Sequence, residues 1–187
     1  GAQVMIELFR RMGRELARLA LISSHSGNMS VRVEEGLLIT RRGAMLGDLR
    51  DENIVKAPLE GPAHGASTEL PVHQAIYRGG EAGAIIHCHP PYAIVLSLHQ
   101  EEIIPLDAEG RYLLGTVPVV TVSESIGSRE VAERLPPLLK QHKVVIVRGH
   151  GSFAVGRDLE EALMVSAVLE ASSRIVFLDL VLRARLG

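Results

Sequence analysis

A short apolar run that ends in two histidines constrains the local fold more than any other feature of the chain. Ala84-Ile85-Ile86 leads into His87-Cys88-His89, and Pro90-Pro91 follows. The apolar run is typical of a buried strand, and the prolines end it because proline cannot continue a central strand. Residues two apart on a strand point to the same face, so both imidazoles can reach one cation while Cys88 points away.

A third histidine, His150, follows a second apolar run. Val144 to Val147 leads into Arg148-Gly149-His150-Gly151, where the glycines allow a close approach of the backbone to a site. A His-x-His pair alone more often reflects ordinary core or surface histidines, so the third histidine is what favours a metal site. Three imidazoles with one open position are typical of a catalytic zinc, although manganese, cobalt or iron would accept the same ligands.

Composition limits the class of protein. The 187 residues are 47% hydrophobic and carry a net charge of −2, which predicts one globular domain over residues 1–187. Aromatic residues make up 3% and no basic run exceeds Arg41-Arg42, so we expect no nucleic-acid partner. No apolar run approaches the ~18–20 residues of a membrane span, and arginines interrupt any signal-peptide core near the N-terminus. One cysteine excludes an internal disulfide, so we expect a cytoplasmic location.

Helical and strand patterns alternate along the chain. Apolar residues at three- and four-residue spacing predict helices at 3–21, 68–77, 91–98, 128–140 and 158 to about 183. A short helix or turn near 51–55 is expected to lead into a strand, and further strands are predicted at 29–33, 37–40, 85–89, 117–120, 143–147 and 152–155. This alternation around a hairpin predicts an α/β fold, a layered α/β/α domain with a central mixed, largely antiparallel sheet.

Small and hydroxyl-bearing residues at two predicted turns and one helix start suggest an anion site. Backbone N–H groups at such places can hold a phosphate. Each motif alone is more often turn or capping chemistry, and the neighbouring Arg41 and Arg42 either add positive potential or are simply solvated. The candidate residues are Gly27, Asn28, Thr40, Gly43, Ser67 and Thr68.

Glu69 directly follows the hydroxyl pair at that helix start. A carboxylate in a first helical turn is often only a partner of the helix dipole. Beside a metal site the same carboxylate could instead be a ligand or a general base. Glu69 is therefore the sharpest single candidate outside the histidines.

Taken in order, these motifs resemble the class II aldolase/adducin head family. Five segments carry the resemblance, and they span residues 23 to about 165: Ser26–Ser30, Leu38–Gly43, Ser67–His73, His87–Pro90 and Gly149–Gly151. One such motif would be weak, whereas five in the family order are specific. The resemblance implies the α/β/α fold of this family and a homotetramer with active sites at the subunit interfaces.

The resemblance also implies roles for the candidate residues. One zinc ion per subunit would be held by His87, His89 and His150, and Glu69 would be its fourth ligand until substrate displaces it and frees it as the base. The six residues of the anion site would bind the substrate phosphate. Family members that cleave fuculose phosphate use a tyrosine near a subunit boundary, and Tyr112 lies in roughly that region, although its surroundings match poorly.

The implied activity is that of a lyase. It is the reversible cleavage of L-fuculose 1-phosphate, or a related ketose 1-phosphate, to dihydroxyacetone phosphate and L-lactaldehyde or another short aldehyde through a metal-stabilised enediolate. No lysine stands in a recognisable Schiff-base context, which agrees with a metal route. Two departures from the family pattern bear on the anion site: Thr68 replaces a serine, and Arg41-Arg42 replaces the commoner Pro-Ser.

Other activities of the family remain open at this point. An aldolase for 5-deoxyribulose or methylthioribulose 1-phosphate would use the same residues. A pentulose-phosphate 4-epimerase would need further acid/base residues, and no convincing set is evident. A methylthioribulose-1-phosphate dehydratase gains a little from Cys88, which is most simply a small buried strand residue. A non-catalytic module like the adducin head need not keep the three histidines and Glu69, all of which are present here.

Overall fold

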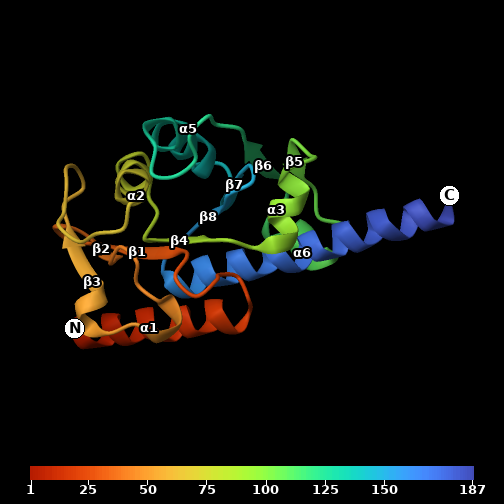
Figure 1. Cartoon of the computed structure of the whole chain (residues 1–187). Helices are drawn as coiled ribbons and strands as arrows, with labels where there is room; N and C mark the ends of the chain where they lie inside the picture. Colours follow the sequence, from red (N-terminus) through yellow and green to blue (C-terminus); the bar gives the residue numbers. More distant parts are fainter.

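Eight strands form one continuous sheet in a computed structural model that describes residues 1–187 (Figure 1). The strand order is β3-β2-β1-β4-β8-β7-β6-β5. All neighbouring strands are antiparallel except β6 and β7, which run parallel, so the predicted mixed, largely antiparallel sheet is confirmed. The strands are β1 (Asn28–Val33), β2 (Gly36–Thr40), β3 (Ile54–Ala57), β4 (Ala84–Cys88), β5 (Glu102–Ile103), β6 (Val117–Val120), β7 (Val144–Val147) and β8 (Gly151–Gly156).

Six α-helices cover the two faces of the sheet, and two 3-10 turns lie at Leu46–Asp48 and Asp51–Asn53. Helices α2 and α5 lie on one face, and α1 and α6 lie on the other (Figure 1). A hydrophobic cluster fills each space between sheet and helices, so the predicted α/β/α layering is confirmed. The helices are α1 (Ala2–Arg18), α2 (Leu70–Arg78), α3 (Pro91–Ser97), α4 (Ala108–Leu113), α5 (Arg129–Leu139) and α6 (Leu159–Leu186).

Capping side chains set the start of several helices. The Ser128 hydroxyl accepts the backbone N–H of Val131 at the start of α5, and the Asp158 carboxylate accepts that of Glu161 at the start of α6. Helix α2 begins at Leu70, two residues later than the sequence predicts. The later start has a local cause, because the Ser67 hydroxyl accepts the backbone N–H of Glu69 and holds the residues before the helix in a turn.

The structure differs from the sequence prediction at the end of α1 and in two short elements. Helix α1 ends at Arg18 rather than at 21, because the backbone turns at Ala20, whose φ is 57°. The sequence patterns also missed β5 and α4, which have two and six residues and are too short for a period to be visible.

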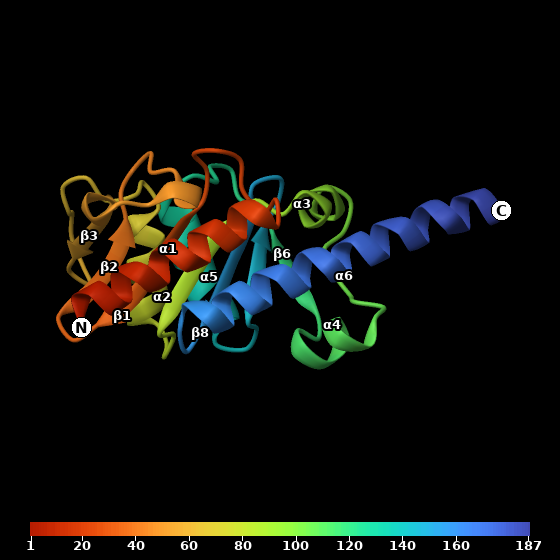
Figure 2. The ribbon, with the colours of Figure 1, turned by 90° about the horizontal axis from the view of Figure 1, so that it is seen from below.

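Helix α6 is longer than the sheet that it covers. Its first turns pack on the sheet and its last turns project away from the rest of the molecule in both views (Figures 1 and 2). No helix of the structure, α6 included, combines the length and the apolar character needed to cross a membrane. The projecting turns carry apolar side chains that stay exposed, among them Leu178 and Leu182.

Candidate metal centre and active-site pocket

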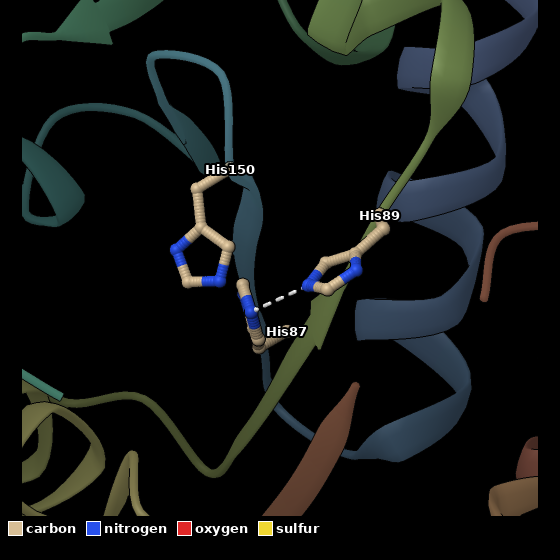
Figure 3. A group of neighbouring side chains, drawn as sticks. All are labelled: His87, His89 and His150. Atoms are coloured by element: carbon tan, nitrogen blue, oxygen red, sulfur yellow. Dashed lines mark hydrogen bonds between the residues drawn. The ribbon is translucent and has the colours of Figure 1, made fainter. Parts of the chain in front are cut away.

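Three histidines lie together where the central strand β4 ends and its neighbour β8 begins (Figure 3). His87 is in β4, His89 follows that strand, and His150 is in the turn between β7 and β8. The pairing of β4 with β8 brings these segments side by side. One ring nitrogen of each histidine lies within 4.8 Å of the others, in the arrangement expected of metal ligands. Cys88 points to the other face, into the hydrophobic cluster beneath α1 and α6.

Backbone carbonyls orient two of the three rings. Nδ1 of His87 lies 2.9 Å from the carbonyl oxygen of Ser152, and Nδ1 of His150 lies 3.1 Å from that of Ser125. A carbonyl oxygen can only accept, so each Nδ1 carries the proton and donates it. The Nε2 atoms are therefore left with free lone pairs, which is how protein ligands present imidazole to a metal.

Burial keeps this cluster neutral. Desolvation lowers the pKa of His87 well below its ordinary value, and the neighbouring imidazoles lower it further. Burial also lowers the pKa of His89, to about 4, and that of His150. Unprotonated imidazole is the form that binds a cation, so the three rings are ready to bind a metal at neutral pH.

The spacing of the ring nitrogens fits a zinc-sized ion. The Nε2 atoms of His87 and His89 are 3.2 Å apart. Two nitrogens held at about 2.0–2.1 Å from one tetrahedral ion would be about 3.3 Å apart. The chemistry of the donors and this separation both agree with a shared divalent cation.

Glu69 places a buried carboxylate beside the histidines. It precedes α2, its side chain is nearly inaccessible, and its Oε1 lies 4.0 Å from Nε2 of His150. Its Oε2 accepts the backbone N–H of Gly127 at 3.1 Å. Burial raises the pKa of Glu69 to about 7, and the bond from Gly127 only partly offsets this effect. The carboxyl group can therefore both take up and release a proton near neutral pH.

The histidines and Glu69 line a pocket of about 190 Å³. The turns before β1 and after β2, the segment before α2 and Ile126 of the loop between β6 and α5 supply the rest of its wall. Five of the six residues predicted for anion binding line this pocket, and Arg41 and Arg42 stand at its rim. The complete lining is His25, Ser26, Gly27, Asn28, Arg41, Arg42, Gly43, Ser67, Thr68, Glu69, His87, His89, Ile126 and His150.

Glycine is required at both turns of the pocket wall. The φ angles of Gly27 and Gly43 are 81° and 74°, in the left-handed region that side chains disfavour. At Gly27 an added Cβ would also lie 2.8 Å from Ile22 and 3.0 Å from the carbonyl oxygen of His87. The absence of a side chain thus lets this turn approach the end of β4.

Two predicted site residues do not line the pocket. Thr40 is fully buried behind the wall, where its hydroxyl oxygen accepts the backbone N–H of Met29 at 3.1 Å and holds the start of β1 beside β2. Tyr112 lies on α4 with its side chain 88% exposed, and it is not part of the pocket of its own chain.

The sequence patterns did not single out the loop between β6 and α5 as part of the site. This loop supplies the carbonyl of Ser125 that orients His150 and the N–H of Gly127 that binds Glu69. Both contacts are made by backbone atoms, so no side-chain type marked them in advance. The only available signal was a polar, glycine-containing stretch between a strand and a helix, which is ordinary loop composition.

An α/β/α domain with three convergent imidazoles, a buried carboxylate and a glycine-lined polar pocket defines a metalloenzyme-type site. Comparison with known families agrees with this class. A sequence model of the family described as class II aldolase and adducin N-terminal domain matches residues 7–177. The chain therefore belongs to the class II aldolase and adducin family, and its relatives identify it as an enzyme of the lyase class.

Individual relatives cover nearly the whole chain. An L-fuculose phosphate aldolase of Methanocaldococcus jannaschii is 30% identical over 178 residues, which are 94% of this chain and 97% of that protein. The crystal structure of L-fuculose-1-phosphate aldolase from Thermus thermophilus is 37% identical, has a TM-score of 0.94, and is covered to 96%, as is this chain. A 5-methylthioribulose-1-phosphate/5-deoxyribulose-1-phosphate aldolase of Rhodospirillum rubrum is 29% identical over 84% of this chain and 73% of its own length.

Proposed function

We propose that this enzyme cleaves a ketose 1-phosphate reversibly to dihydroxyacetone phosphate and a short aldehyde, with L-fuculose 1-phosphate as substrate and L-lactaldehyde as the aldehyde. The observation that carries the proposal is the shared pocket. Three neutral imidazoles and a buried carboxylate share its lining with glycine, amide and hydroxyl groups. The names of the relatives in Methanocaldococcus and Thermus support this choice of substrate.

Zinc is the proposed cofactor, one ion per subunit, held by His87, His89 and His150 with Glu69 as fourth ligand in the absence of substrate. When bound, the ion would supply Lewis-acid polarisation of the substrate carbonyl. The protein groups prepare the ligand set, since the carbonyls of Ser152 and Ser125 hold two rings with Nε2 free. Burial keeps the imidazoles unprotonated at neutral pH.

Glu69 is the proposed base. Its raised pKa lets the carboxyl group exchange a proton with the carbon next to the substrate carbonyl at neutral pH. The hydrogen bond from Gly127 fixes one carboxylate oxygen and leaves Oε1 on the side of His150. Once substrate displaces this carboxylate from its place as a ligand, the same group would be free to act as the base.

The phosphate group is proposed to occupy the part of the pocket that is lined by glycine, amide and hydroxyl groups. Gly27 and Gly43 have the left-handed backbone that allows their N–H groups to face an anion. Asn28, Ser67 and Thr68 add amide and hydroxyl donors, and Thr40 supports this wall from behind. Anchoring the phosphate would fix the reacting carbons near Glu69 and convert binding into orientation.

The working assembly is proposed to be a homotetramer with active sites at subunit interfaces. The exposed apolar side chains on the projecting part of α6 support an association between subunits. Tyr112 is exposed and lies outside the pocket of its own chain, so we propose that it takes part as a proton donor from a neighbouring subunit. A cytoplasmic location is proposed because the single cysteine, Cys88, forms no disulfide.

The proposal is tested by measuring dihydroxyacetone phosphate release from a panel of ketose 1-phosphates. The panel contains L-fuculose 1-phosphate, 5-deoxyribulose 1-phosphate and 5-methylthioribulose 1-phosphate, the last two because of the relative in Rhodospirillum. Zinc-loaded protein, chelator-treated protein and Glu69→Gln are assayed in parallel. We expect release that requires both metal and Glu69, and the best substrate names the activity.

Absence of release from zinc-loaded wild-type protein would contradict the proposal. Epimerase and dehydratase assays on pentulose phosphates and methylthioribulose 1-phosphate would then follow. Protein that purifies without stoichiometric metal, binds none on reloading and has none of these activities would instead point to a structural module like the adducin head.

A further inference from the structure

A chain of four polar side chains runs from the core to the pocket. His73 of α2 is fully buried, and its two ring nitrogens have different partners. Nε2 lies 2.6 Å from Oδ1 of Asn28, and Nδ1 lies 2.6 Å from Oγ of Ser30. The Ser30 hydroxyl in turn lies 2.7 Å from the hydroxyl of Tyr77. Only Asn28, at the end of this chain, lines the active-site pocket.

The direction of these hydrogen bonds follows from the chemistry of the groups. The Asn28 Oδ1 atom can only accept, so Nε2 of His73 carries the proton and donates it. Burial lowers the pKa of His73 to about 3, so the ring is neutral and Nδ1 has no proton. Nδ1 therefore accepts from the Ser30 hydroxyl, whose oxygen accepts from the Tyr77 hydroxyl.

This direction leaves one donor at the pocket. Nδ2 of Asn28 has no hydrogen-bond partner within the chain, and it is not among the enclosed polar atoms that lack one. Since Asn28 lines the pocket, its NH₂ group is accessible there. If the amide were turned over, an oxygen lone pair would face the same space and would repel an anion. An amide that is not held can adopt either orientation, because its two ends have nearly the same shape.

We propose that His73 is a positioning residue that holds the Asn28 amide with its NH₂ group toward the phosphate of the substrate. This inference rests on the proposed function and names a device within it. Ser30 and Tyr77 support the orientation from behind, because in this arrangement the Tyr77 hydroxyl donates to Ser30 and the Ser30 hydroxyl donates to Nδ1 of His73. A merely structural network could end on any buried acceptor, whereas this one ends on an amide whose other half is free at the pocket.

The test compares variants of two neighbouring residues of α2. His73→Phe keeps an aromatic ring but removes the donor to Asn28. Gln74→Leu is the matched control: Gln74 is also buried, donates to the carbonyls of Pro58 and Gly61, and does not line the pocket. Binding of inorganic phosphate to the zinc-loaded proteins is measured by calorimetry, and KM and kcat are measured with L-fuculose 1-phosphate.

We expect His73→Phe to weaken phosphate binding and to raise KM roughly tenfold, the order expected for losing a hydrogen bond to a charged group, with a smaller change in kcat. Gln74→Leu should stay within about twofold of wild type in both constants. His73→Gln, whose amide has both a donor and an acceptor, should recover part of the loss. In an Asn28→Ala background His73→Phe should have no further effect, since the two residues would act through one contact.

Two results would overturn the inference while leaving the proposed function intact. One is a phosphate affinity of the His73→Phe variant equal to that of the wild-type enzyme. The other is a set of imidazole ¹⁵N chemical shifts, measured by NMR, that places the His73 proton on Nδ1. A wild-type protein that binds no phosphate and cleaves no ketose phosphate would instead overturn the proposed function, and this inference with it.

Discussion

At the scale of single residues, Glu69 is the group whose state depends most on its surroundings. Glu69 is 3% exposed, and the basic side chain within ion-pairing distance, His150 at 4.0 Å, is neutral because burial lowers its pKa. The only partner with a proton is the backbone N–H of Gly127. A buried carboxylate with a single hydrogen bond is costly to ionise, which explains why its pKa rises to about 7.

The raised pKa has a consequence for the stability of the metal-free protein. The folded state holds the Glu69 proton more tightly than the unfolded chain does, so ionisation of this group destabilises the fold as pH rises from about 4.5 to about 7. Glu69→Gln cannot ionise, so metal-free Glu69→Gln should exceed wild type in free energy of unfolding by about 3 kcal/mol at pH 8 and by less than about 1 kcal/mol at pH 5. Urea unfolding in chelator at the two pH values measures the difference.

The comparison of the two proteins isolates this residue. Because burial lowers the pKa values of the three histidines, the fold loses stability as pH falls below their ordinary pKa. This loss is the same in wild type and in the variant. Their effect therefore cancels in the difference. Equal stabilities of the two proteins at pH 8 would show that Glu69 is not buried as an acid.

At the scale of elements, the turn after β2 concentrates positive charge at the pocket. Arg41 and Arg42 both line its rim, and neither guanidinium pairs with a carboxylate. The Arg41 guanidinium donates only to the carbonyl of Glu52, and the Arg42 side chain has no hydrogen-bond partner in the chain. Cations without an acidic partner at the rim of a phosphate-type wall would attract a doubly charged substrate.

This arrangement predicts a salt-dependent substrate affinity. Arg42→Ser should raise KM for a ketose 1-phosphate about three- to tenfold at low ionic strength and leave kcat nearly unchanged, because the residue has no part in the proposed proton transfer and adds only attraction. The increase of KM with added salt should also be smaller than in wild type. Steady-state kinetics from about 20 mM to about 500 mM salt, roughly the range over which screening changes most, would measure both effects.

Lys140→Ser is the matched control for this variant. It removes the same unit charge from the end of α5, outside the pocket. Its KM and salt response should match those of wild type. If Arg42→Ser and Lys140→Ser respond alike, the arginines at the rim are simply solvated.

The elements and the pocket differ in how far the sequence predicts them. Apolar runs and helical spacing predict the strand before His87, the strand before His150 and the long helices, because each buries a regular face. Whether the two strands that carry the histidines lie side by side depends on sheet pairing. Only the order of the motifs, through the family resemblance, made this predictable. The loop of Ser125 and Gly127 was not predictable, since its contribution is two backbone groups. Thr40 was predicted to bind the anion, but its hydroxyl accepts the backbone N–H of Met29 and does not line the pocket.

At the scale of the whole molecule, α6 presents an apolar stripe that the chain itself does not cover. Ile175, Leu178, Leu182 and Leu186 follow each other at three- and four-residue spacing, and the side chains of Leu178 and Leu182 are 50% and 57% exposed. The helix projects beyond the sheet at this point (Figure 2). A single chain therefore exposes apolar surface that a second subunit would bury.

Charges placed on this stripe should disrupt the assembly. The double substitution Leu178→Lys and Leu182→Lys should lower the mass in solution, because association would then bury two unpaired charges. Sedimentation velocity at several protein concentrations measures the change. Val4→Lys, at an exposed apolar position of α1, is the control and should keep the wild-type mass. A double variant with an unchanged assembly would place the subunit contact elsewhere.

If the assembly completes the active site, two defective subunits should restore each other. Glu69→Gln lacks the proposed base and Tyr112→Phe lacks the proposed donor, so each variant alone should be weakly active. The pocket takes Glu69 from its own chain, whereas Tyr112 is exposed and would reach the pocket of a neighbour. In a ring formed from an equal mixture, roughly one site in four would then receive both intact residues.

Chains of the two variants that are unfolded and refolded together should regain about this share of wild-type activity. Chains that are refolded separately and then mixed should regain it only as fast as subunits exchange. No gain after joint refolding would mean that Tyr112 does not act across an interface, and would leave Glu69 and the histidines as a site that one subunit completes.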